Sequence, residues 1–154
     1  MDGLVQQQII QAKDYVLRAF PDIDRARLEI TSPETGLYNC IAYAADDTRR
    51  WWWPDKMGTF YWPPGIQRSE TIIVFQRAFE TLGYVISPDS TLEQGIEKIG
   101  FFHKQNKPTH AAKQLQDGAW TSKLGQSFDI SHDLEGLQGD EYGRIALIMK
   151  RPKS

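Results

Sequence analysis

The chain has 154 residues, 40% of them apolar and 25% charged, which is the composition of a single soluble domain with a sizeable core. Its formal net charge of −2 supplies no basic field for a nucleic-acid backbone, and no apolar run reaches membrane-spanning length, so we expect neither nucleic acid nor a membrane as partner. A single cysteine excludes an internal disulfide, and no signal-peptide pattern opens the chain, so we expect a cytoplasmic protein.

The first elements along the chain are predicted to be helical. Apolar residues at helical spacing predict a helix over 4–20, which Pro21 ends. A polar linker over 22–36 follows. A short helix is then predicted from Cys40 to about Asp46, since Asn39 is a favoured N-cap residue.

An aromatic and proline-rich segment over 49–68 fits neither the helical nor the strand period, and it predicts a loop. A second amphipathic helix is expected after it. Ser69 is its predicted N-cap and Gly83 its predicted C-terminal cap.

Strand patterns dominate the rest of the chain, and Asp117-Gly118 is a hairpin signal between two of them. The predicted elements are strands over 84–86, 98–103, 109–115, 119–123 and 144–150, and a short helix over 131–138. We therefore expect an α+β fold in which N-terminal helices pack on an antiparallel sheet. The predicted organisation is one domain over 1–154, with segments 1–36, 37–83 and 84–152.

Cys40 is the first candidate for chemistry. At the N-terminus of its predicted helix, peptide dipoles and unpaired N–H groups stabilise a thiolate, so the position predicts an activated nucleophile. The alternative is a small buried side chain beside Ile41 and Ala42.

His110 is the second candidate, because it opens a predicted strand. An imidazole at a sheet edge can meet a thiol at a neighbouring helix start, take its proton and pass it to a leaving group. The alternative is a surface or capping histidine.

Four segments, YNCIAYAADDTRRWWWP, YWPPG, THAAKQLQDGAWTSKLG and GDEYGRIAL, resemble an uncharacterised bacterial family of unknown function, from about Tyr38 to Pro152. The order of a helix-borne Asn-Cys-x-Ala-x-Ala, a strand histidine and an Asp-Gly-x-Trp-x-x-Lys hairpin is more distantly similar to the papain-like cysteine hydrolases of the NlpC/P60 type. This resemblance implies a papain-like fold with Cys40 as nucleophile and His110 as general base and acid.

The resemblance also implies a third catalytic residue at Ser122, where those relatives carry a histidine. The hairpin register leaves its partner open: a two-residue loop places Thr121 on the His110 face, and a three-residue loop places Ser122 there. Gln114 shares that face in either register and is a second candidate. Further residues able to orient the imidazole are Asp129, His132 and Asp133.

Substrate contacts are expected from side chains near Cys40. Its backbone N–H is one oxyanion donor, and Asn39 or Tyr38 is the candidate for the second. Trp53 and Trp62 are expected to shape a groove, although large aromatics can equally close a small core. Lys123 is either a charge near the site or a surface lysine.

These observations predict a cysteine hydrolase or acyl transferase that acts on an amide, ester or thioester bond of a peptide-like or acyl substrate. The alternative is a non-catalytic binding domain of the same fold, with a buried Cys40, an aromatic groove and a protein partner. Either would suit a defence or toxin system. No metal-ligand spacing or phosphate-binding glycine pattern is present, so no metal or cofactor is predicted.

Overall fold

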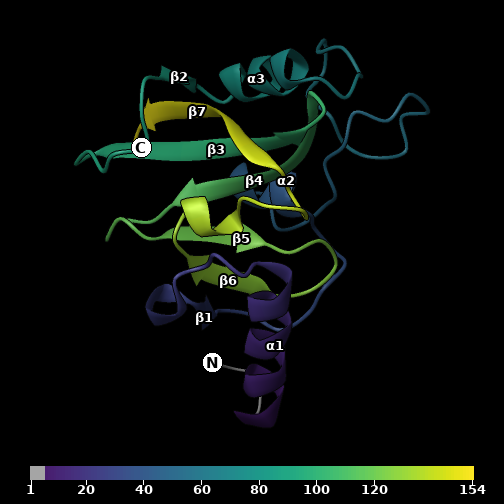
Figure 1. The fold of residues 1–154 in the computed structure, drawn as a ribbon. Helices are drawn as coiled ribbons and strands as arrows, with labels where there is room; N and C mark the ends of the chain where they lie inside the picture. Colours follow the sequence, from purple (N-terminus) through teal and green to yellow (C-terminus); the bar gives the residue numbers. More distant parts are fainter. Residues whose placement is uncertain (1–5) are drawn as a thin grey trace.

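The computed structural model describes residues 6–154, which form an open antiparallel sheet with few helices (Figure 1). In the described part, seven strands lie in the order β1-β6-β5-β4-β3-β7-β2. The strands are β1 (Glu29–Ile30), β2 (Val85–Ser87), β3 (Ile96–Lys104), β4 (Lys107–Gln114), β5 (Trp120–Lys123), β6 (Asp129–His132) and β7 (Arg144–Pro152). The helices are α1 (Gln6–Ala19), α2 (Cys40–Ala44) and α3 (Ile72–Glu80), with 3₁₀ turns η1 (Arg25–Arg27) and η2 (Glu135–Leu137). The predicted α+β class is confirmed.

Local signals account for the ends of the helices. α1 stops at Ala19, before Pro21, as predicted; residues 4 and 5 of the predicted helix lie outside the described part. Asn39 caps α2, because its Oδ1 accepts the Ala42 N–H at 3.1 Å. Gly83 follows α3 with a φ of 93°, a left-handed conformation that favours glycine.

The predicted cap of α3 is wrong by two residues. Thr71, not Ser69, is the N-cap, and its hydroxyl accepts the Val74 N–H at 3.3 Å. A capping hydroxyl stands two or three residues before the N–H that it binds, and α3 begins at Ile72, so Ser69 lies too early in the chain.

The helix predicted over 131–138 is also wrong. Residues up to His132 belong to β6, and only the short turn η2 follows. β6 pairs with β5 on one side and with β1 on the other, so the linker before α2 supplies an edge strand. These two short strands satisfy each other's backbone groups across about a hundred residues of chain, and a local pattern cannot reveal such a pairing.

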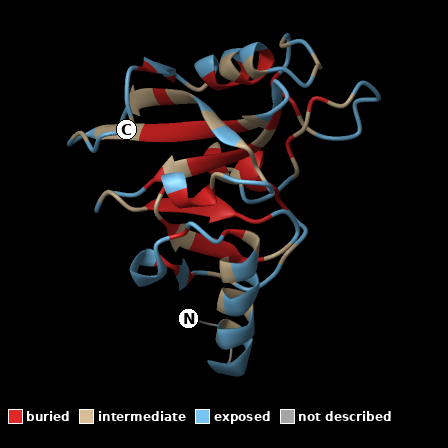
Figure 2. Cartoon of the chain, viewed as in Figure 1, coloured by how far each residue is buried: buried red, intermediate tan, exposed pale blue. Residues whose placement is uncertain are grey.

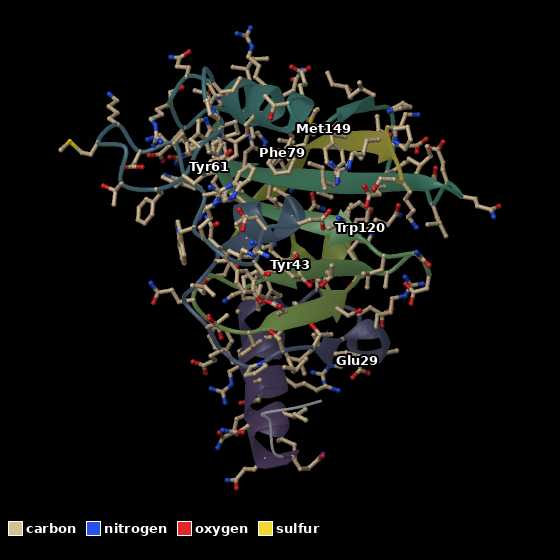
Figure 3. The ribbon with its side chains drawn as sticks, turned by 180° about the vertical axis from the view of Figure 1, so that it is seen from behind. Glu29, Tyr43, Tyr61, Phe79, Trp120 and Met149 are labelled. Carbon is tan, nitrogen blue, oxygen red and sulfur yellow. The ribbon has the colours of Figure 1, made fainter. Side chains whose placement is uncertain are left out.

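Two apolar cores cover the two faces of the sheet. Figure 2 shows that buried residues are concentrated along its central strands. The consecutive residues Phe101 and Phe102 of β3 enter different cores, because side chains alternate along a strand. We call the core that contains Phe79, Phe101 and Met149 the α3-side core, and the core that contains Phe102 and Trp120 the α1-side core. Figure 3 shows Phe79 of α3 close to Met149 of β7.

Candidate functional site

Cys40 lies at the start of α2, where this helix packs on β4. Its side chain is only 8% exposed. Burial raises the pKa of the thiol to about 11, and this outweighs the backbone N–H groups of Ala111 and Ile41 and the charge of Lys123, which lower it. The predicted activation of the thiol is therefore wrong for this state of the protein, since the thiol is protonated at neutral pH.

His110 lies on β4 next to Ala111, whose N–H contacts the thiol, but no hydrogen bond joins it to Cys40. Its ring stacks on Tyr142 with centroids 4.0 Å apart and packs against Phe102. Both of those rings belong to the α1-side core, whereas Ala111 and Cys40 belong to the α3-side core. The fold thus places the thiol of α2 against Ala111 of β4 and the His110 ring in the other core, without direct contact between the two predicted catalytic residues.

The register of the hairpin between β4 and β5 decides which side chain shares the face of His110. Lys113 pairs with Thr121 and Gln114 with Trp120, and the Leu115 N–H bonds the Ala119 carbonyl at 2.7 Å. The loop therefore has three residues, and Ser122 stands on the His110 face. The two-residue register that would place Thr121 there is wrong.

A buried chain of hydrogen bonds links three side chains from three adjacent strands. His110 Nε2 lies 2.9 Å from Ser122 Oγ, which lies 2.7 Å from His132 Nε2. The other nitrogen of His132, Nδ1, lies 2.6 Å from the Asp133 carbonyl oxygen. All three side chains are fully buried, and we call them the imidazole relay.

When both rings are neutral, the hydrogen bonds of the relay determine which nitrogen of each histidine carries the hydrogen. A carbonyl oxygen only accepts, so His132 Nδ1 carries its hydrogen and its Nε2 accepts the Ser122 hydroxyl. Ser122 Oγ then accepts the Nε2–H of His110. Nδ1 of His110 is consequently a bare lone pair, and it has no hydrogen-bond partner.

Burial keeps both rings neutral. It lowers the pKa of His110 well below 6.5, and the neighbouring His132 lowers it further. It lowers the pKa of His132 to about 4, although the Asp133 carbonyl partly offsets this. Neither imidazole is charged at pH 7.

The other residues considered as orienting groups have other partners. Gln114 shares the His110 face, but its amide donates to the Ser90 carbonyl at 3.0 Å. Asp129 accepts the Tyr38 hydroxyl at 2.8 Å. Only His132 joins the relay through its side chain, and the sequence offered that role solely as one of several open alternatives.

Tyr38 and Lys123 lie in the interior near the thiol. Lys123 is fully buried and donates from Nζ to the carbonyls of Gly125, at 2.9 Å, and Ser127, so a surface lysine is excluded. The ammonium group lies 5.4 Å from the centre of the Tyr38 ring. Burial raises the pKa of Tyr38 to about 12, and its bond to Asp129 adds to this effect.

Asn39 uses its side chain to join α2 to the tryptophan-rich segment. Its Oδ1 accepts the N–H groups of Ala42 and Trp52, and its Nδ2 donates to the Trp52 carbonyl at 2.7 Å. The side chain is thus a cap and an anchor, and one N–H of its amide remains for any further ligand.

The tryptophans act mainly as core residues. Trp62 is buried, packs 4.9 Å from Phe75 and donates its indole N–H to the Gln67 carbonyl at 3.1 Å. Trp53 is half-buried and meets Phe75 edge to face at 5.4 Å. The expectation that Trp62 lines a groove is therefore wrong, because its ring is enclosed in the α3-side core.

A surface cavity of about 560 Å³ reaches the ring that covers His110. It is lined by Tyr15, Phe20, Glu34, Leu124, Gly125, Gln126, Ser127, Glu141 and Tyr142. This lining contains two carboxylates and no basic side chain. Burial raises the pKa of Tyr142, so its hydroxyl is neutral at this wall.

Residues 6–154 contain neither a candidate metal cluster nor a helix that could span a membrane. No cluster of three or more histidine, cysteine, aspartate or glutamate side chains could hold a metal ion. None of the helices described combines the length and apolar character needed to cross a bilayer.

Comparison with known proteins gives one match. A family model described as a domain of unknown function (DUF7689) matches residues 29–150, which contain β1 to β6, most of β7, and the helices α2 and α3. No curated protein and no solved structure matches the chain. Because the match covers most of the sequence, the chain belongs to the DUF7689 family of domains of unknown function.

Proposed function

We propose that this domain is a papain-like cysteine hydrolase or acyl transferase acting on an amide, ester or thioester bond, with Cys40 as nucleophile and His110 as general base. The observation that carries the proposal is the bare Nδ1 of His110. This lone pair belongs to the residue next to Ala111, whose N–H contacts the thiol, and the relay occupies the opposite nitrogen. A histidine acts as a base in this way when one ring nitrogen is held by a hydrogen bond and the other is free to accept a proton.

The reaction follows from these groups. The thiol proton moves to Nδ1 of His110 while sulfur attacks the substrate carbonyl, and a C–S bond forms. Nδ1 then gives the proton to the departing oxygen, nitrogen or sulfur as its bond to carbon breaks. Water, or another acyl acceptor, next attacks the thioester; its proton passes through Nδ1 to the sulfur as the C–S bond breaks.

The proposed resting state is a neutral thiol beside a neutral imidazole. Since burial raises the pKa of Cys40 and lowers that of His110, proton transfer awaits the substrate. The Lys123 ammonium group and the Ala111 N–H both favour the thiolate that forms. No hydrogen bond joins the thiol to the imidazole in the unliganded protein, so the proposal requires the Cys40 sulfur and His110 Nδ1 to come into contact in the substrate complex.

Oxyanion stabilisation is assigned to the backbone N–H of Cys40 at the first turn of α2. The remaining amide N–H of Asn39 is the candidate for a second donor, because its other contacts hold it beside that turn.

A burst assay with p-nitrophenyl acetate tests this proposal. We expect one nitrophenolate released per chain in a fast phase, because the acyl group remains on sulfur. Cys40→Ala should abolish the burst, and His110→Gln should slow it by about 10²- to 10⁴-fold. His103→Gln is the matched control, since His103 is half-buried and lies outside the relay. Equal rates for the wild type and Cys40→Ala would refute the proposal.

The second candidate is a non-catalytic binding domain with a protein partner. The 8% exposure of Cys40 and its pKa of about 11 favour it, because both describe an inert buried thiol. This alternative predicts no burst in a folded wild-type protein. It also predicts that alkylation of Cys40 by iodoacetamide has the same rate and pH dependence in the wild type and in His110→Gln.

A further inference from the structure

We infer that His132 is a positioning residue which, through Ser122, holds His110 in the tautomer whose Nδ1 is free of hydrogen. The catalytic consequence of this inference rests on the proposed function. The tautomer of His110 does not, because it follows from the hydrogen bonds of the relay alone.

The order of donors and acceptors along the relay is fixed at His132, where the relay meets the Asp133 carbonyl. His132 Nδ1 lies 2.6 Å from the Asp133 carbonyl, and this oxygen has no hydrogen to give. Asp133 is held in turn through its carboxylate, which accepts the Asp24 N–H at 2.8 Å and the Gly136 N–H at 3.0 Å. The acceptor that orients His132 is therefore tied to the segment after α1 and to η2.

The turn around Asp133 is too tight for any side chain at Gly136. A Cβ atom at this position would lie 2.6 Å from the Cα of Ile23 and would also contact the Asp133 carboxylate. Glycine thus allows η2 to approach the chain after α1, and the Asp133 carbonyl gains a defined position.

Ser122 links the hydrogen position on His132 to that on His110, because a hydroxyl has only one hydrogen to donate. While His132 Nε2 accepts that hydrogen, Ser122 Oγ can only accept from His110, so His110 carries its hydrogen on Nε2. Without an acceptor at residue 132, the hydroxyl would donate to His110 Nε2 instead. His110 would then carry its hydrogen on Nδ1 and could not act as a base there.

Burial prevents water from replacing the missing acceptor. His110, Ser122 and His132 are all fully buried, and the His110 ring is covered by Tyr142 on one face and bordered by Phe102. In such surroundings an unsatisfied hydroxyl reorients toward the nearest acceptor, which here is His110.

Nitrogen-15 NMR of the imidazole rings in the full chain at pH 7 tests the inference without requiring activity. In the wild type we expect His110 to carry its hydrogen on Nε2. In His132→Phe we expect it mainly on Nδ1. His132→Gln should restore the wild-type tautomer, because a glutamine amide oxygen can accept the Ser122 hydroxyl near the place of the lost nitrogen. His103→Phe, outside the relay, should leave His110 unchanged.

Ser122→Ala provides a second test if His132→Phe does not fold. It removes the bridge, so His110 loses its imposed direction and should show both tautomers. An Nδ1–H tautomer in the wild-type protein, or an unchanged His110 in both His132→Phe and Ser122→Ala, would overturn the inference.

The p-nitrophenyl acetate assay separates this inference from the proposed function. If both hold, His132→Phe should slow the burst by about 10- to 100-fold and His132→Gln should recover most of that loss. If the tautomers change as expected but the wild type shows no Cys40-dependent burst, the proposed function fails and the positioning role of His132 stands. A Cys40-dependent burst with unchanged tautomers refutes the positioning role and leaves the proposed function intact.

Discussion

The two faces of the sheet solve the same packing problem with different chemistry. The α3-side core is filled by aromatic rings, among them Trp62, Phe75 and Phe79, whose contacts are numerous and individually weak. The α1-side core also encloses the relay, whose few hydrogen bonds each have one correct partner. Truncating the first core leaves a cavity, whereas disturbing the second redirects protons, so the two regions should respond to different perturbations.

The largest loss of stability should come from truncating an aromatic residue of the α3-side core. Trp62→Ala should lower the free energy of unfolding by about 3–5 kcal/mol, because a buried indole and its contact with Phe75 are lost. Urea denaturation measures this loss. Trp51→Ala is the control, because the half-buried Trp51 meets only Phe60 among neighbouring rings in the described chain, and about 1 kcal/mol is expected there. Equal losses for both variants would contradict a core role for Trp62.

Low pH should destabilise the protein through the buried histidines of the α1-side core. The pKa of His132 is about 4 in the folded protein and 6.5 is its ordinary value, so between these values the unfolded chain binds more protons. Stability is therefore complete above pH 6.5 and falls as the pH drops toward 4, by about 3 kcal/mol from this group. Denaturation midpoints across this range measure the slope. His132→Gln should have a shallower slope, and an identical slope would exclude His132 as its source.

The smallest effect should lie outside both cores. Asp14 and Arg18 form an exposed ion pair one turn apart on α1. Asp14→Asn should change the free energy of unfolding by less than about 0.5 kcal/mol, because solvent screens the pair. Thermal unfolding at low and high salt measures this change. A loss above 1 kcal/mol would show that α1 depends on this pair more than on its packing in the α1-side core.

Much of the fold could be predicted where a local pattern is sufficient. The helical spacing and Pro21 located α1, Asn39 located the start of α2, and Asp117-Gly118 located the hairpin. The N-cap of α3 was a local error of two residues, whereas the larger error involved partners distant along the chain: β1 and β6 pair with each other, and neither has a strong strand pattern of its own.

For the candidate site, residue types and spacing identified Cys40 and His110, and the resemblance to papain-like enzymes added Ser122. The contact between His110 and Ser122 depended on the length of the hairpin loop, which the sequence left open. His132 joins them only because β6 is a strand, and its residues had been predicted partly as helix.

The sequence by itself determined the end of α1, the start of α2, the antiparallel hairpin and the residue types able to act as nucleophile and base, because these depend on neighbours a few positions away. Only the tertiary structure decided the protonation states. A helix N-terminus lowers the pKa of a thiol, yet the packing around Cys40 raises it to about 11, and the amount of water excluded by distant segments is not encoded in any local pattern. The tautomer of His110 likewise depends on three strands and a carbonyl at Asp133, since a proton is assigned by the whole chain of donors and acceptors.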